Sequence, residues 1–192
     1  YPNVGQCMLD PTAFPALEAV LDVVYNPFRT ELLLRAEEHG ITIAGGFEML
    51  VAQAVFAAQH FTGRFYATDS MIPTATRRLA HQLANISLIG MPGCGKTTIG
   101  AALAKRLGKT FVDLDEEIER RTGNNIPDIF AREGEEAFRR YEADTLADLA
   151  KQTGQVIACG GGVIKTPANV RALRQNGTVL WVQRPLGKLA TG

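Results

Sequence analysis

Residues 90–97, with the sequence GMPGCGKT, are suited by type and spacing to bind a phosphate group. They fit the pattern G-x-x-x-x-G-K-[ST], which forms a phosphate-binding loop where a strand precedes it and a helix follows it. Glycines let backbone amides point at phosphates, and a helix N-terminus adds a favourable potential. Lys96 would place positive charge at the β- and γ-phosphates, and the Thr97 hydroxyl would bind Mg²⁺. The motif predicts an ATP-dependent phosphotransferase or an NTPase, with a ligand-free glycine turn as the alternative.

The residues expected to contact ATP are Gly93, Cys94, Gly95, Lys96, Thr97 and Thr98. Cys94 also allows thiol chemistry as an alternative, but the loop requires only that its side chain be small. The chain has three widely spaced cysteines, an odd number that suits a reducing, cytosolic compartment better than a disulfide framework.

Asp113 and Asp115 follow a short apolar run, at the kind of position where α/β sheets bind ligands. Alternation along an extended strand would place both carboxylates on one side, facing one site. One would hold Mg²⁺ through water, and the other would accept a proton from an attacking hydroxyl. The alternative is that Asp115 only caps the helix that follows it.

Arg139 and Glu142 are three residues apart in a helical stretch and therefore share a face. Glu142 would hold the guanidinium in place for bidentate binding of a carboxylate, with a solvated surface ion pair as the alternative. Farther along the chain, residues 160–162 are three glycines, which would let the backbone approach a polar substrate closely. A tight turn without a ligand explains these glycines about as well.

The segments around these residues alternate between strand and helix patterns. Strands are expected at 86–89, 110–113, 155–159 and 178–182. Helices are expected at 97–107, 115–121, 126 to about 152 with an interruption near Gly134, and 167–177. This alternation predicts parallel βαβ units in an α/β sheet that is covered by helices on both faces.

The first 85 residues repeat the alternation on a smaller scale. Strands are expected at 22–25 and 41–44, and helices at 31–39 and about 47–61. Thr30 would cap the first of these helices, and Gly40 would end it. Residues 64–85 are expected to form a connector in which 73–84 are helical.

Length and charge exclude several classes of protein. The 192 residues allow one ordinary domain or two small ones, and 20 basic against 20 acidic side chains give a formal net charge of zero. Such a chain has no strong global field for nucleic acid or anionic lipid. The apolar runs are far shorter than the about 18 residues of a membrane span, and no secretion signal is visible. We expect a globular cytoplasmic protein without nucleic-acid or membrane partners.

In combination, the phosphate loop, D-x-D at 113–115, F-R-x-x-E at 138–142 and G-G-G at 160–162 resemble the shikimate kinase family. The resemblance covers residues 86–192 in the family's order. It implies a P-loop kinase fold and transfer of the γ-phosphate of ATP to the 3-hydroxyl of shikimate, a step in chorismate and aromatic amino-acid biosynthesis.

The resemblance also implies roles for individual residues. Asp115 would activate the attacking hydroxyl, and Arg139, with Glu142 behind it, would bind the shikimate carboxylate. The residues implied for catalysis are Lys96, Asp113 and Asp115, and those implied for Mg²⁺ are Thr97 and Asp113. The residues implied for shikimate are Asp115, Arg139, Glu142, Gly160, Gly161 and Gly162.

The chain departs from the family in two respects. The family continues into a lid with an arginine near the transferring phosphate and a further arginine that grips the substrate, and neither follows here. Where family members often stack an arginine on adenine, this chain has Leu189 or Ala190. Losing a charge of this kind costs about 10³–10⁵ in rate. We therefore expect the 192-residue chain to turn over poorly or not at all.

The ends of the chain suggest a piece of a longer protein. It starts at Tyr1 without an initiator methionine and ends at Gly192 inside an expected helix. The last strand of the family's sheet would be missing, and an oligomer could form by pairing at the exposed sheet edge.

Residues 1–63 resemble the C-terminal stretch of shikimate dehydrogenase, through residues 22–27 (DVVYNP) and 46–53 (GFEMLVAQ). The resemblance implies a partial Rossmann-like segment and a bifunctional fusion, joined by a linker at 64–85. The residues it implies for shikimate are Tyr25 and Gln53, and those for the nicotinamide are Gly46 and Met49. NADP would bind only the complete dehydrogenase, whose catalytic residues would lie upstream, so no dehydrogenase activity is expected. The alternative is that residues 49–51 are core and Gln53 is an ordinary helix residue.

Two other functions remain open. One is another small P-loop kinase, for a nucleotide, gluconate or adenylylsulfate. The other is a nucleotide-binding or assembly module without catalysis. Arg139 and Glu142 beside Asp115 favour a carboxylated polyol as the acceptor over these alternatives.

Overall fold

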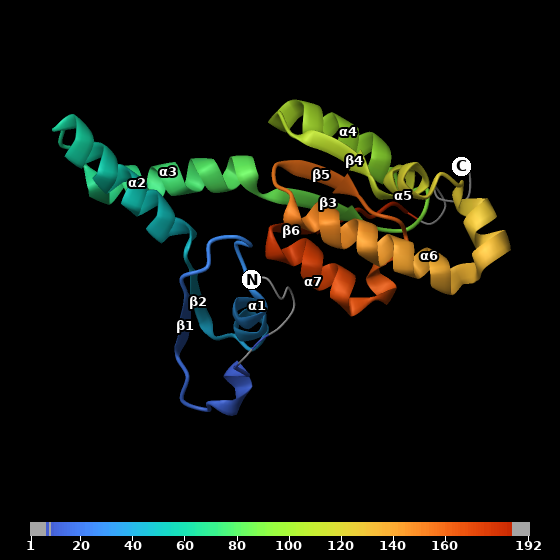
Figure 1. The fold of residues 1–192 in the computed structure, drawn as a ribbon, viewed down its shortest axis with the longest axis horizontal. Coiled ribbons are helices and arrows are strands. Elements are labelled where there is room, and N and C mark those ends of the chain that lie inside the picture. The colour runs from blue at the N-terminus through green and yellow to red at the C-terminus, as the bar shows by residue number, and fades with distance from the viewer. Residues whose placement is uncertain (1–6, 8, 186–192) are drawn as a thin grey trace. The chain divides into compact units, whose positions relative to one another are not determined.

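The computed structural model describes residues 7 and 9–185, and the chain divides after Leu83 into two compact units. The first unit holds the elements from β1 to α3, and the second holds those from β3 to β6 (Figure 1). Leu189 and Ala190, which were named for their place beside adenine, lie outside the described residues.

The second unit is built on a four-stranded parallel sheet with the order β4-β5-β3-β6. Its strands are β3 (Asn85–Ile89), β4 (Thr110–Asp113), β5 (Gln155–Ala158) and β6 (Gly177–Trp181). In register, Ile86 pairs with Val156 of β5 on one side and with Thr178 of β6 on the other. All four residues of β5 are buried, as expected for a strand with helices on both faces. The predicted α/β fold with a parallel sheet is confirmed.

The helices of this unit are α4 (Lys96–Leu107), α5 (Leu114–Thr122), α6 (Ile126–Lys151) and α7 (Pro167–Gln175). Figure 1 shows α4 on one side of the sheet and α6 and α7 on the other. The predicted interruption of the long helix is present at Gly134, whose φ of 83° and ψ of 176° are not helical. A short 3₁₀ helix, η2 (Val163–Lys165), precedes α7.

Two apolar clusters hold these layers together. The larger one joins α5, α6 and α7 to the sheet through buried residues that include Leu114, Ile118, Leu146, Ile157 and Leu173. The smaller one lies under α4 and contains Leu88, Ala104 and Val156.

Gly100 lets α4 lie close to the sheet. A Cβ atom at this position would stand 2.6 Å from Cε2 of Phe111 and 3.2 Å from Cδ1 of Leu88. Any larger residue would therefore push the helix away from the strands, because packed interiors leave no room for one more carbon.

The first unit contains a two-stranded parallel sheet of β1 (Ala19–Asp22) and β2 (Thr42–Gly45), joined by α1 (Glu31–Glu38). It begins with a 3₁₀ turn, η1 (Pro11–Ala13). Its small core is formed by Val20, Leu33 and Ala36. The predicted cap is present, since the Thr30 hydroxyl accepts a hydrogen bond from the Leu33 amide at 3.4 Å.

The strand predicted at 22–25 was wrong in position, because β1 ends where that prediction begins. Asp22 pairs with Gly45, the last residue of β2, and this is the last pair of the ladder. The Asp22 carboxylate then accepts hydrogen bonds from the Val24 amide at 3.0 Å and the Thr30 hydroxyl at 2.7 Å. These bonds turn the chain out of the sheet.

Two 16-residue helices, α2 (Phe47–Thr62) and α3 (Thr68–Leu83), complete the first unit. The helix predicted at 73–84 starts five residues earlier, and Pro73 lies inside it. Its first turn forms before the proline, because the Ala67 carbonyl accepts the amides of Ser70 and Met71. Most of the expected connector is thus a helix, which packs against α2. Among the described residues, no helix combines the length and apolarity needed to cross a membrane.

Candidate active site

The phosphate loop at residues 90–97 joins the end of β3 to the start of α4, the context that its motif requires. Gly93 and Gly95 have φ angles of 73° and 95°, which residues with a side chain rarely adopt. The loop is therefore shaped by glycines at the positions where the backbone must turn. Thr97 and Thr98, in the first turn of α4, are exposed beside it.

Lys96 turns its ammonium group back toward this loop. Its Nζ donates hydrogen bonds of 3.0 Å to the carbonyl oxygens of both Gly90 and Met91. The Sγ atom of Cys94 lies 3.9 Å from the same nitrogen, and Cys94 is buried. The loop thus fixes a cation at the N-terminus of α4, where the helix dipole also favours a bound anion.

Asp113 links the phosphate loop to α5. Its Oδ2 accepts a 2.8 Å hydrogen bond from the Thr97 hydroxyl, and its Oδ1 accepts one of 3.1 Å from the Asp115 amide. Asp113 is the last residue of β4 and the N-cap of α5. Both carboxylate oxygens therefore have a partner, and Oδ2 is the one beside Thr97.

The predicted arrangement of the two aspartates on one strand end was wrong. Helix α5 starts at Leu114, so the two-residue alternation of a strand stops at Asp113. Asp113 binds Thr97, whereas Asp115 lines the pocket described next. The alternative, in which Asp115 is the helix cap, was also wrong, because Asp113 has that role.

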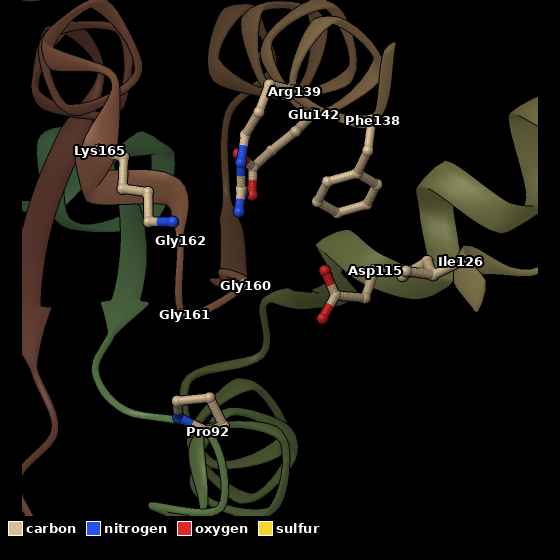
Figure 2. A pocket seen from close by; sticks show the side chains of 10 residues that line it. All are labelled: Pro92, Asp115, Ile126, Phe138, Arg139, Glu142, Gly160, Gly161, Gly162 and Lys165. Atoms are coloured by element: carbon tan, nitrogen blue, oxygen red, sulfur yellow. The ribbon is translucent and has the colours of Figure 1, made fainter. Parts of the chain in front are cut away.

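A pocket of about 320 Å³ lies beside the phosphate loop (Figure 2). It brings together all six of the residues that were predicted for an acceptor, with further residues from the loop, α6 and η2. Its lining residues are Pro92, Asp115, Ile126, Phe138, Arg139, Glu142, Gly160, Gly161, Gly162 and Lys165. The volume is at the lower end of the range for small-molecule sites.

Arg139 and Glu142 form an ion pair at one wall of the pocket (Figure 2). Arg139 Nη1 donates to Glu142 Oε2 at 2.9 Å, and Glu142 is fully buried. The other oxygen, Oε1, has no hydrogen-bond partner among the described residues. A buried carboxylate is stable only with its cation in place, so this pair is not the solvated surface pair that was the alternative.

The three glycines after β5 make room for these side chains. A Cβ atom at Gly162 would lie 2.4 Å from Arg139 Nη1, and one at Gly160 would lie 2.9 Å from Asp115 Oδ1. A Cβ atom at Gly161 would stand 3.0 Å from the Pro92 ring of the phosphate loop. The glycines thus do more than form a turn, because they let the backbone contact both sides of the pocket.

Asp115 has the electrostatic setting of a proton acceptor. Burial raises its pKa above the usual 3.8, the carboxylates of Asp113 and Glu142 raise it further, and Lys96 acts in the opposite direction. A carboxylate with a raised pKa holds a proton more strongly once it accepts one.

The sequence did not single out three charged residues near these groups. Glu135 and Lys165 lie beside Arg139, joined to one another at 3.4 Å. Arg184, beyond β6, donates from Nη1 to the Gly93 carbonyl at 3.1 Å. None of the three belongs to a motif, and only the fold brings them to the site.

In the first unit, the residues named for a dehydrogenase lie around the start of α2. Gly46 donates its amide to Val24 O at 3.1 Å, and a Cβ atom there would stand 2.0 Å from Val23 O. A hollow of about 500 Å³ is lined by residues 23–26 and so includes Tyr25. On α2, Met49 and Gln53 are exposed, whereas Val51 is buried. Of residues 49–51, then, Val51 is core and Met49 is not.

A parallel α/β sheet with a phosphate loop at one strand end and a polar pocket beside it is the arrangement of the P-loop class, which includes kinases and NTPases. The sequence model of the shikimate kinase family matches residues 92–191, which is more than half of the chain. The chain belongs to the shikimate kinase family.

Individual relatives give the same result. The shikimate kinase of Nitrosomonas europaea is 52% identical over 105 residues, covering 55% of this chain and 50% of its own length. That of Symbiobacterium thermophilum is 50% identical over 98 residues, covering 51% and 56%. This chain therefore spans about half the length of the curated relatives it matches.

Two solved structures share the fold. The shikimate kinase of Acinetobacter baumannii, in complex with shikimate, has a TM-score of 0.56 and 43% identity, covering 58% of this chain and 63% of that one. The shikimate kinase of Aquifex aeolicus has a TM-score of 0.51 and 36% identity, covering 54% and 61%.

Proposed function

We propose that the site transfers the γ-phosphate of ATP to the 3-hydroxyl of shikimate. The observation that carries the proposal is the pocket in which Asp115 faces an arginine already fixed by a buried glutamate, next to the phosphate loop. A guanidinium held in this way binds a carboxylate, and the aspartate suits a hydroxyl group. The substrate in the Acinetobacter baumannii complex carries both groups.

The chain's own residues divide the chemistry between them. Lys96 would leave the carbonyls of Gly90 and Met91 and bind the transferring phosphate. Asp115 would accept the proton of the attacking hydroxyl while the oxygen of that hydroxyl forms a bond to the γ-phosphorus. The bond from that phosphorus to the β,γ-bridging oxygen breaks, and ADP leaves with the bonding electrons. Arg139 would hold the acceptor by its carboxylate, and Gly160–Gly162 would let the ring approach the backbone.

Thr97 and Asp113 would hold Mg²⁺. Their oxygens lie 2.8 Å apart at the mouth of the phosphate loop, and Mg²⁺ prefers such donors, usually one or two protein groups together with phosphates. The ion would neutralise charge on the phosphates. No cluster of three or more His, Cys, Asp or Glu side chains suited to a metal occurs in the described part of the chain, so the phosphates would supply the remaining ligands.

A thermal-shift and turnover experiment tests the proposal. With a non-hydrolysable ATP analogue and Mg²⁺ present, shikimate should raise the melting temperature, whereas gluconate, adenylylsulfate and nucleoside monophosphates should not. A coupled ADP assay should show slow, shikimate-dependent turnover. If a different acceptor raised the melting temperature and shikimate did not, that compound would be the substrate in place of shikimate. Binding of nucleotide without any acceptor would favour a module that lacks catalysis, and a rate normal for the family would contradict the expected weak activity.

We also propose that residues 1–63 are the C-terminal part of a shikimate dehydrogenase, fused to the kinase through residues 64–85. The parallel β1–α1–β2 unit and the glycine packed at the start of α2 support this, since nucleotide-binding folds use both features. Tyr25 and Gln53 would serve shikimate, and Gly46 and Met49 the nicotinamide of NADP. The reading frame upstream of Tyr1 tests the fusion. It should encode a glycine-rich nucleotide loop, and a frame that encodes another domain would contradict the proposal.

A further inference from the structure

Two cations face each other across one side of the acceptor pocket. Arg139 reaches in from α6, and Lys165 extends toward it from the end of η2 (Figure 2). Both line the pocket. The Lys165 side chain is 65% exposed and the Arg139 side chain 24%, so the lysine is the outer of the two.

A single carboxylate oxygen lies between these cations. Glu135 Oε1 accepts hydrogen bonds from Arg139 Nη2 at 3.2 Å, Arg139 Nε at 3.4 Å and Lys165 Nζ at 3.4 Å. Arg139 first, and then Lys165, lower the pKa of Glu135 below its usual 4.5. The carboxylate is therefore charged at neutral pH and is held by both cations.

The two edges of the guanidinium have different partners. Nη1 is bound to Glu142, which is fully buried, so this contact belongs to the interior. The edge formed by Nε and Nη2 is bound to Glu135, whose side chain is 59% exposed. An arginine binds a carboxylate best through two N–H groups on one edge. The outer edge is suited to that task, and an exposed side chain occupies it.

We propose that Arg139 and Lys165 form a two-cation cradle for the carboxylate of the acceptor, and that Glu135 is a built-in substitute anion that this carboxylate displaces. The inference rests on the proposed function, because it takes shikimate as the acceptor. It makes Lys165 a further substrate-binding residue. It also makes Glu135 a competitor, whose presence weakens binding of any acceptor with a carboxylate and has no such effect on a neutral one.

A matched arrangement elsewhere in the same unit supplies the controls. Asp148 accepts hydrogen bonds from Arg121 at 2.9 Å and from Lys151 at 3.2 Å, so it also joins an arginine to a lysine. These three residues do not line the pocket. The substitutions D148N and K151M therefore make the same charge changes as E135Q and K165M on a comparable ion network without touching the acceptor.

Calorimetric titration of the protein with shikimate, at low salt and with an ATP analogue present, tests the inference. K165M should weaken shikimate binding by about two- to fivefold, and E135Q should tighten it by about two- to fivefold, as expected for partly exposed ion pairs. D148N and K151M should change nothing. Both effects should shrink in 1 M salt and disappear with the carboxamide of shikimate, which lacks the charge.

A general structural disturbance would weaken shikimate binding in both variants, whereas the cradle predicts weaker binding in K165M and tighter binding in E135Q. If both substitutions weaken binding, or if the carboxamide responds as shikimate does, the cradle is refuted while the proposed function stands. An unchanged affinity in K165M refutes it as well. If the unmodified protein binds ATP but no shikimate, the proposed function fails, and this inference fails with it.

Discussion

The phosphate loop and the acceptor pocket share Pro92 but are built in different ways. The loop is eight consecutive residues, shaped by glycines and joined to a strand and a helix. The pocket takes its residues from the loop, α5, α6 and the segment after β5, and side chains make most of it. A local motif can therefore define the first site, whereas only the packed fold defines the second. Substitutions in the two regions should fail in different ways.

The largest effect is expected in the loop. Lys96→Met removes the charge that would meet the transferring phosphate, so the turnover rate should fall by about 10³–10⁵-fold. Shikimate binding, measured by calorimetry, should stay close to that of the unmodified protein, because Lys96 does not line the pocket. Equal losses in the affinity for ATP and for shikimate would show that the two sites are not separable.

Asp115→Asn should produce the next largest effect, in the pocket. The rate should fall by about 10²–10⁴-fold, since an amide cannot accept the proton, while ATP still binds. In the unmodified protein, the rate should rise with pH as Asp115 ionises. Because its pKa is raised, this rise should occur at a higher pH than for an ordinary aspartate. A pH profile whose acidic limb is the same in Asp115→Asn would exclude Asp115 as the base.

Gly162→Ala tests the close packing of the backbone against Arg139 without changing any charged side chain. Its Cβ would collide with the Arg139 guanidinium, 2.4 Å from Nη1, and would push it out of position. We expect the KM for shikimate to rise by about 10- to 100-fold, because a small misplacement of a binding group is costly. The affinity for ATP should not change. Gly161→Ala, which would meet only the Pro92 ring at 3.0 Å, should have a smaller effect.

The smallest effect concerns an ion network outside both sites. Hydrogen bonds from Arg120 and then Arg121 lower the pKa of Glu117 from 4.5 to about 2. The carboxylate therefore stabilises the fold above about pH 4.5, and this stability is lost as the pH falls toward 2. Glu117→Gln should cost about 1 kcal/mol at pH 7 and progressively less at pH 4 and 3. Melting curves at pH 7, 4 and 3 should show this loss of stability, with Glu116→Gln, a change at an exposed neighbour, as the control. A loss of stability in Glu117→Gln that is the same at every pH would contradict the prediction.

The same contrast explains what the sequence could predict. The strands and helices after residue 85 were predicted to within about two residues, because each apolar run is bounded by glycine or a cap. The β1 strand was misplaced because its end depends on pairing with Gly45, a contact that no local pattern reveals. Asp113 and Asp115 were identified as a pair, but their separate roles follow from the helix that begins between them. Glu135 and Lys165 are 30 residues apart and unremarkable in sequence, and only the fold makes them neighbours.

Gly100 has no side chain, yet it determines how closely the first turn of α4 lies to the sheet. Since α4 starts at Lys96, the helix carries the ammonium group and the Thr97 hydroxyl on its first turn, and the missing side chain at Gly100 fixes where that turn lies. Gly100, where α4 contacts Phe111 and Leu88, lies one helical turn after Lys96. Adding one methyl group at that point would move the Lys96 ammonium group and the Thr97 hydroxyl relative to Asp113, which is the last residue of β4. The positions of Lys96 and Thr97 relative to Asp113 thus depend on the lack of a side chain at Gly100.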